Sequence, residues 1–463
     1  MRRRVIIENF GKIEHVELEM KPMMMFVGDN NSGKSYLMNL LWGFSSESSA
    51  LLTHLTENIL SSDLYKECEQ YLIGKIAEAE IEEILSAEWF EKFLKLLNLC
   101  VEQNKDRFVS EIFNKEMHIG KLKLDMEDEE KIEIIVESTS IFCEVTNRGR
   151  TNRGRTNREK QGYVITEKTM WIRLFKYYQM GMQIEGKDAL QRRKYVKFVL
   201  NMLLKYCTDI SVQEGDPVFL PSSRTGFVLS KNLIINHMYE NSFNRGSDLV
   251  PSYFTKPVIS FLKLLNSVGE IEGKNQELCK LAEFIERSVL HGQVERQDTT
   301  ARAFLYKPEN IDDSIQMYLA SAVVTEITPL YLLCKYQHMI SQMFIEEPEM
   351  CLHPQLQTAV AKVLVRMCNM GIPVIMTTHS DIIIQHINNM LRVNNSDKKQ
   401  ELMEKFQIEE QDLLKENQVG VYQFTCRGEE SSGIEELRAG TMGFETTTFS
   451  NAFEEMLELT YDI

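Results

Sequence analysis

The stretch Phe26–Tyr36, F-V-G-D-N-N-S-G-K-S-Y, decides how this chain folds. It begins inside a short apolar run, Met23–Val27, that is typical of a buried strand. It leads into Tyr36–Trp42, which has the pattern expected at the start of a helix. Four of its residues fit the spacing G-x-x-x-x-G-K-[ST] of a phosphate-binding loop: Gly28, Gly33, Lys34 and Ser35. The stretch therefore predicts a strand, a phosphate loop and a helix in succession.

Each residue type in this loop has a physical role. Glycines let the backbone turn so that successive N–H groups face one phosphate, and the helix N-terminus adds partial positive charge. Lys34 is expected to contact the β- and γ-phosphates, and the Ser35 hydroxyl is expected to ligate Mg²⁺. The predicted nucleotide-binding residues are Gly28, Asp29, Asn30, Asn31, Ser32, Gly33, Lys34, Ser35 and Tyr36.

Bulk composition limits the kind of protein. A length of 463 residues with 43% hydrophobic content allows two or three lobes with real cores. The net charge of −16 argues against a protein that coats nucleic acid over its whole surface, but not against a local basic groove. Nine cysteines without a C-x-x-C pair read as reduced side chains. No apolar leader core and no 18-residue apolar window occur, so we expect a cytoplasmic protein without a membrane partner.

The remaining periodicities outline the lobes. Helical spacing dominates 45–117, including Ile81–Leu85, and returns at 170–207 and 229–291. Strand-like alternation over 121–146 predicts a small antiparallel sheet at the edge of the nucleotide lobe. We therefore expect an α/β fold: a P-loop lobe with a mixed sheet (1–43 and 316–463), a large helical insertion (44–120), a small antiparallel β-subdomain (121–166) and a helical lobe (167–315) that contains a core strand at 218–224 and a hairpin at 294–306.

A basic repeat interrupts the β-subdomain. T-N-R-G-R occurs at Thr146–Arg150 and Thr151–Arg155, and a third copy starts at Thr156. Five arginines and Lys160 against Glu159 give residues 147–160 a charge of +5. The repeat is either a basic finger that contacts nucleic-acid phosphates or a duplicated loop tip without a role. We favour the loop tip, because perfect tandem copies resemble recent duplication.

Two later strands end in polar residues that complete a nucleotide site. Met343–Glu349 reads M-F-I-E-E-P-E, an apolar run that ends in two carboxylates. Adjacent carboxylates repel unless a cation lies between them, so Glu346 is expected to hold the metal. Glu347 is expected to accept the proton of the attacking water. Pro373–Met376 is another short strand, and it ends in T-T-H-S, which makes His379 a candidate for positioning that water.

Arg224 follows the predicted core strand directly. A cation at that place is either a sensor of phosphate or partner, or a side chain that bridges a loop. The residues alone do not decide between the two.

The three motifs together resemble the ABC-type ATPase family that includes RecF, SMC proteins and the OLD-family ATPases. They are G-D-N-N-S-G-K-S, F-I-E-E-P-E-M-C-L-H-P and T-T-H-S, and the opening I-I-E-N-F-G-K-I resembles that family's first strand. The resemblance implies ATP and Mg²⁺ as ligands, Lys34 and Ser35 as Walker A, Glu346 and Glu347 as Walker B, and His379 as the switch histidine. The stretch around His353 corresponds to the D-loop. Glu346 stands where Asp is more usual.

The family also has a signature motif that contacts the γ-phosphate of a partner subunit. Leu319–Glu326, L-A-S-A-V-V-T-E, lies just before the second half of the site, and Ser321 is the candidate contact. This segment lacks the usual double glycine of the motif. The resemblance therefore implies a homodimer or a larger homo-oligomer, with a signature helix that departs from the family pattern.

Two functions are compatible with these features. The first is an ATP-driven switch that controls a separate effector, a nuclease or toxin, as the resemblance to "AAA ATPase" subunits of the PARIS and Septu anti-phage defence systems implies. No further acidic cluster of the nuclease kind follows His379, and Glu429–Glu436 reads as a loop and a helix start. The second is a RecF-like DNA-binding repair ATPase, with nucleic acid as partner. Long SMC-like coiled-coil arms are excluded, because Gly74 and the strands at 121–146 interrupt the heptads. The large helical insert argues against a transporter subunit.

Overall fold

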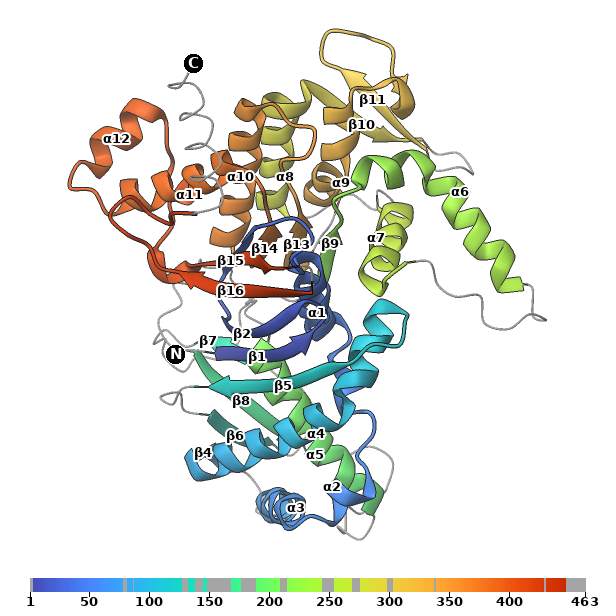
Figure 1. The fold of residues 1–463 in the computed structure, drawn as a ribbon, viewed down its shortest axis with the longest axis vertical. Coiled ribbons are helices and arrows are strands. Elements are labelled where there is room, and N and C mark those ends of the chain that lie inside the picture. The colour runs from blue at the N-terminus through green and yellow to red at the C-terminus, as the bar shows by residue number, and fades with distance from the viewer. Residues whose placement is uncertain are drawn as a thin grey trace.

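The computed structural model describes residues 3–77, 81–85, 87–126, 132–137, 145–147, 168–175, 189–208, 215–243, 254–268, 275–297, 303–336, 339–428 and 430–446. A nine-stranded mixed sheet crosses the middle of the molecule (Figure 1). Its order is β5 (Ile119–Met126), β1 (Arg3–Phe10), β2 (Ile13–Glu19), β16 (Ser431–Leu437), β15 (Val419–Arg427), β3 (Met23–Gly28), β14 (Val374–Thr377), β13 (Ile340–Glu346) and β9 (Asp216–Leu220).

The two halves of this sheet differ in strand direction. From β15 through β3, β14 and β13 to β9, every neighbouring pair is parallel. The other half contains the antiparallel pairs of β5 with β1, β1 with β2, and β15 with β16. The carboxyl ends of the parallel strands therefore meet at one edge, where ligands of open α/β sheets bind.

Helices cover both faces of the sheet. One core contains side chains of α1 (Lys34–Ser46), α4 (Ala87–Phe113) and α5 (Ala189–Thr208), together with Met24 and Phe26 of β3. The other contains side chains of α8 (Gln276–Ile285), α9 (Ala322–Tyr336), α10 (Pro354–Asn369) and α11 (Asp381–Asn394), together with Met23, Met25 and Val27. Because successive strand residues point to opposite faces, β3 supplies both cores.

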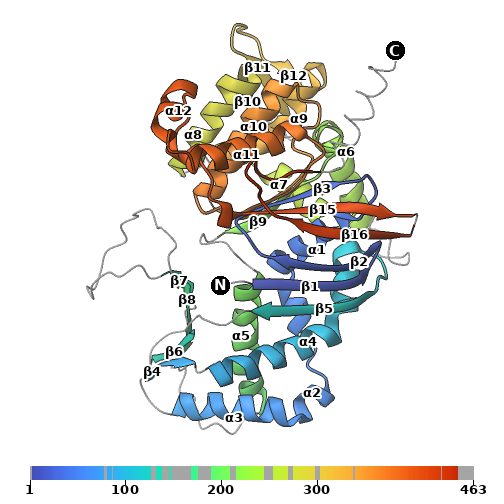
Figure 2. The ribbon, with the colours of Figure 1, turned by 60° about the vertical axis from the view of Figure 1, so that its left-hand side comes forward.

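The remaining elements lie at the two ends of the molecule. In Figure 2, α2 (Glu57–Ser61) and α3 (Asp63–Ala77) lie on the side of α4 and α5, and α12 (Lys399–Phe406), which contacts α11, lies on the other side. α6 (Arg224–Phe243) and α7 (Lys256–Ser267) follow β9. Two small sheets consist of β4 (Ile81–Leu85), β6 (Ile132–Glu137), β8 (Lys168–Phe175) and β7 (Val145–Asn147), and of β10 (Gly292–Arg296), β11 (Phe304–Pro308) and β12 (Ile315–Gln316). Short 3₁₀ helices at Ser48–Leu52, Met317–Leu319, Glu410–Asp412 and Glu416–Gln418 and a π-helical turn at Glu286–Leu290 complete the described elements.

The α/β fold class with a mixed sheet is confirmed, and so is the hairpin predicted at 294–306, which β10 and β11 form. The core strand predicted at 218–224 is β9, which ends at Leu220 before a turn. No helix in the described part of the chain is long and apolar enough to cross a membrane.

Four local predictions are wrong. Ile81–Leu85 and Lys168–Phe175 are strands rather than helices, since each pairs with β6. The strand at 121–125 pairs with β1 in the main sheet rather than in a separate one. Ser431–Leu437 is a strand that pairs with β15, not a loop and helix start. In each case pairing with a distant strand decides the conformation of a segment whose own pattern is ambiguous. The basic repeat lies outside the described residues, apart from Thr146 and Asn147 of β7.

Candidate functional site

The phosphate loop links the end of β3 to the start of α1, as the motif predicts. Gly28 and Gly33 have φ angles of 113° and 99°, in the left-handed region where a side chain is strained. A Cβ on Gly28 would lie 2.0 Å from the backbone oxygen of Phe424. Both loop glycines are therefore required by the backbone path itself.

Strand β15 holds this loop from the side. The Asp29 N–H donates to the Phe424 carbonyl at 3.0 Å, and the Cys426 N–H donates to the Asp29 carboxylate at 2.8 Å. Inside the loop, the Ser32 hydroxyl donates to the Asp29 carbonyl at 2.7 Å. These bonds fix the loop before its N–H groups meet any ligand, which is a preorganised arrangement.

Lys34 is buried over its own loop. Its ammonium group donates to the carbonyl of Gly28 at 3.1 Å, and its residue exposure is 6%. Burial lowers the pKa of Lys34, while the charges of Glu347 and Asp29 oppose that shift. The lysine is thus close enough to Glu347 for their charges to interact.

The two candidate metal ligands contact each other. Glu346 is buried at the end of β13, its carboxylate accepts the Ser222 N–H at 3.2 Å, and the nearby Ser35 hydroxyl acts to lower its pKa. Burial raises the pKa of Glu346. A hydroxyl and a carboxylate at one point are hard oxygen donors of the kind that Mg²⁺ uses together with phosphate and water. No group of three or more His, Cys, Asp or Glu side chains with metal-site geometry occurs in the described ranges.

Glu347 and His379 belong to the same cluster. Glu347 has a φ of 43°, unusual for a residue with a side chain, and its N–H donates to the Thr377 carbonyl at 2.9 Å. Burial and the charge of Lys34 lower the pKa of His379, whereas Glu347 raises it. The strand order β3–β14–β13 places the three predicted groups, Lys34, His379 and Glu347, at neighbouring strand ends.

Glu349 also belongs to the site; from the sequence it is the next candidate for the general base if Glu347 is not that base. Its carboxylate accepts hydrogen bonds from the His379 N–H and the Thr378 hydroxyl. Its place as the last Glu of E-E-P-E was the signal in the sequence, because its two contacts join residues that lie 29 and 30 positions apart.

Arg224 lies behind the site. Its guanidinium is almost fully buried and donates to the carbonyls of Glu346 at 2.6 Å and Glu347 at 2.9 Å. It also forms an ion pair with Glu326 of α9 at 2.7 Å. These contacts favour a side chain that bridges a loop over a sensor of phosphate or partner.

Ser321 and His353 lie on the surface. Ser321 precedes α9, and its hydroxyl oxygen accepts the Val324 N–H at 3.4 Å. His353 is the N-cap of α10, and both side chains are exposed. The hydrogen bonds of the described residues connect neither of them to the phosphate loop of the same chain.

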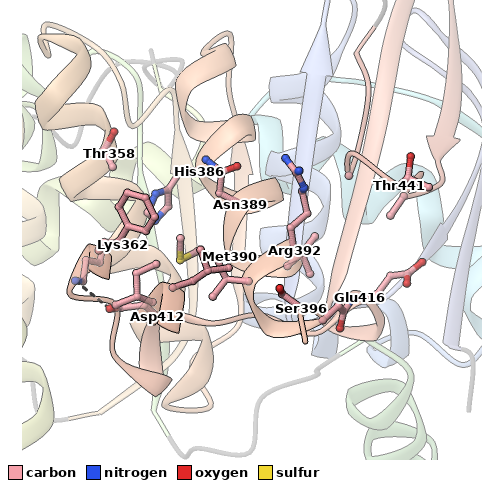
Figure 3. Close-up of a pocket in the computed structure, with 18 of the residues that line it drawn as sticks. Thr358, Lys362, His386, Asn389, Met390, Arg392, Ser396, Asp412, Glu416 and Thr441 are labelled. Carbon is pink, nitrogen blue, oxygen red and sulfur yellow. Dashed lines mark ion pairs between the residues drawn. The ribbon is translucent and has the colours of Figure 1, made fainter. Parts of the chain in front are cut away.

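A separate cavity of about 890 Å³ lies between α10, α11 and α12 (Figure 3). Lys362 and Asp412 form an ion pair of 2.9 Å on its wall, and His386 and Arg392 also line it. No phosphate-loop or Walker B residue is part of its lining. The cavity is therefore distinct from the predicted nucleotide site.

Comparison with known proteins finds a family model that matches part of the chain and a set of solved structures of low similarity. Residues 1–207 match the family model of an AAA ATPase domain, which includes the phosphate loop and ends before β9. Among curated proteins no match was found.

Three solved SMC head structures align along most of this chain at low similarity. The SmcHead bound to the C-winged helix domain of ScpA has 9% identity and a TM-score of 0.35, covering 94% of this chain and 98% of that one. The SMC head domain from Thermotoga maritima has 9% identity and a TM-score of 0.31, covering 94% and 99%. The Smc head domain with an extended coiled coil, from Pyrococcus furiosus, has 9% identity and a TM-score of 0.32, covering 99% of both chains.

The residues that match the family model include the phosphate loop between β3 and α1. Residues 1–207 of this chain are therefore similar to an AAA ATPase domain.

Proposed function

We propose that this chain is an ATP-binding and ATP-hydrolysing switch of the ABC type. One observation carries the proposal: Lys34, Glu347 and His379 come from segments far apart in sequence and follow the adjacent carboxyl ends of the parallel strands β3, β13 and β14. A phosphate-binding cation, a candidate base and an imidazole in one cluster match what γ-phosphate hydrolysis requires.

Each residue then has a role in that reaction. The loop N–H groups and Lys34 bind the phosphates, and Ser35 with Glu346 would hold Mg²⁺, which neutralises charge that develops on the phosphates. Glu347 accepts the proton of the attacking water as the water oxygen bonds to the γ-phosphorus, and the bond from that phosphorus to the β–γ bridging oxygen breaks, so that ADP leaves. His379 orients that water and the γ-phosphate oxygens.

Assembly is the second part of the proposal. In an ABC-type site the γ-phosphate is contacted by the signature segment of a partner subunit, and Ser321 is exposed at the start of α9 as such a contact requires. Its neighbours Tyr318 and Leu319 are 71% and 65% exposed, and they would add apolar area to a joint surface. We propose that ATP promotes a homodimer, alone or as the unit of a larger ring.

The switch would act on a separate effector, a nuclease or toxin, in anti-phage defence. This part rests on the resemblance of the three motifs to the ATPase subunits of such systems. We also propose that the chain divides into a nucleotide lobe and inserted lobes.

Light scattering tests the assembly. Wild type and Ser321→Arg are compared with Mg²⁺, with and without a slowly hydrolysed ATP analogue. Ser61→Arg is the matched control, because it adds the same side chain at an exposed serine on α2. We expect analogue-dependent assembly of wild type and Ser61→Arg, but not of Ser321→Arg, whose bulk would separate the two surfaces.

Two outcomes would contradict different parts of the proposal. A wild type that stays monomeric with the analogue contradicts ATP-dependent self-assembly. A Ser321→Arg protein that assembles like wild type contradicts only the placement of the signature contact.

A further inference from the structure

Glu349 connects the segment after β13 to the turn after β14. One of its carboxylate oxygens accepts the backbone N–H of His379 at 2.5 Å, and the other accepts the hydroxyl of Thr378 at 3.0 Å. Both bonds go to a charged acceptor, so each is stronger than a neutral hydrogen bond. Glu349 therefore holds the backbone on which the His379 imidazole is mounted.

The rest of this turn is also anchored, but through other atoms. The Thr378 N–H donates to the Phe26 carbonyl at 3.1 Å, and the Thr378 hydroxyl oxygen accepts the Ser380 N–H at 3.0 Å. The Ser380 hydroxyl donates to the side chain of Gln357 on α10 at 2.6 Å. These contacts keep the turn in place on β3 and α10, so that loss of Glu349 would free the His379 N–H without unfolding the turn.

The segment that carries Glu349 is itself tightly held. The Met350 N–H donates to the Glu347 carbonyl at 3.1 Å, and the Leu352 N–H donates to the Glu349 carbonyl at 3.0 Å. Arg224 donates to the Glu347 carbonyl from behind. Glu349 is thus a rigid bridge from the candidate base to the candidate switch histidine.

We infer that Glu349 is a positioning residue for His379 in ATP hydrolysis, and that it is not an alternative general base. The inference rests on the proposed function of this site. Both carboxylate oxygens already accept hydrogen bonds from the His379 turn, whereas a general base must direct an oxygen at the attacking water. A catalytic group that moves by about 1 Å loses about 100-fold in rate, which gives such a bridge a kinetic role.

The two available substitutions separate positioning from base catalysis. In Glu349→Gln the side-chain oxygen can still accept the His379 N–H, and the new amide can donate to the Thr378 hydroxyl oxygen. Glutamine therefore retains both contacts but has no basic oxygen. Glu349→Ala removes both contacts.

Steady-state ATPase kinetics test the inference with wild type, Glu349→Ala, Glu349→Gln, His379→Ala and the double variant of Glu349→Ala with His379→Ala. We expect Glu349→Ala to lower kcat by about 10- to 100-fold while the KM for ATP changes by less than about threefold. Glu349→Gln should recover most of the kcat that alanine loses. The double variant should be no slower than His379→Ala alone, because Glu349 acts through His379.

Several results would overturn this inference. If the kcat of Glu349→Gln were as low as that of Glu349→Ala, Glu349 would be a base. If the double variant lost kcat by the product of the two single effects, Glu349 would act independently of His379. Wild-type kcat in Glu349→Ala with a slow His379→Ala would remove the role of Glu349 and leave the proposed function intact. Wild-type kcat in His379→Ala would instead contradict the role of the histidine in the proposed function.

Discussion

Replacement of Arg224 by methionine should destabilise this protein strongly. The Arg224 guanidinium is paired with Glu326 at 2.7 Å, and both side chains have 2% of their surface exposed. Without it, the donors left to the Glu326 carboxylate among the described residues are the Thr225 N–H at 3.1 Å and the Thr225 hydroxyl at 2.7 Å. The carbonyls of Glu346 and Glu347 would also lose the hydrogen bonds from the guanidinium, although the Glu347 carbonyl keeps the Met350 N–H at 3.1 Å.

The size of the effect follows from these contacts. Breaking one side of a buried ion pair costs about 3 to 5 kcal/mol, because the remaining charge stays buried without compensation. The hydrogen bonds lost at the two carbonyls increase that loss, so we expect Arg224→Met to lower the free energy of unfolding by at least about 3 kcal/mol. Since small domains have total stabilities of about 5 to 15 kcal/mol, this is a large fraction.

Urea unfolding followed by circular dichroism measures this loss. Adding Glu326→Gln to Arg224→Met should restore about 2 kcal/mol, because glutamine removes the buried charge and still accepts from Thr225. Lys280→Met is the control, since it breaks an exposed pair with Glu277 and should change stability by less than about 0.5 kcal/mol. An Arg224→Met protein within about 1 kcal/mol of wild type would refute the bridging role of Arg224.

Two further predictions concern the phosphate loop and the separate cavity. Lys34→Ala should weaken ATP binding at least about 100-fold by calorimetry, because it removes the cation on the β- and γ-phosphates; unchanged affinity would refute the loop assignment. Burial lowers the pKa of His386 to about 4, so the unfolded chain binds a proton there before the folded protein does. The free energy of unfolding should therefore fall by on the order of 2 to 3 kcal/mol as the pH drops from about 6.5 to about 4. The substitution His386→Phe should remove that part of the pH dependence. If the free energy of unfolding depended on pH in the same way in wild type and in His386→Phe, the result would contradict a buried, neutral His386.

Local signals explain which parts of the fold could be predicted. The run Met23–Val27, the loop glycines and the helix after Lys34 depend on neighbours within a few residues, so the motif predicts them well. The ends of β13 and β14 could be placed next to the loop because parallel strands of one sheet have their carboxyl ends at the same edge.

Distant pairing explains what the sequence could not predict. β15 lies beside β3 although their residues are almost 400 positions apart, and its contacts with Asp29 hold the phosphate loop. Ile81–Leu85 has apolar residues that fit a helix or a strand, and only β6 decides between them. The burial of Arg224 likewise depends on Glu326, about 100 residues downstream, so its bridging contacts carry no local signal.

The measurement that tests the central claim most directly is ATP binding and ATP turnover in Glu347→Gln. Glutamine is nearly isosteric with glutamate but cannot accept the proton of the attacking water. We expect ATP affinity by calorimetry within about threefold of wild type, together with a kcat at least about 100-fold lower. Turnover at the wild-type rate would contradict the assignment of Glu347 as the general base of an ATPase site.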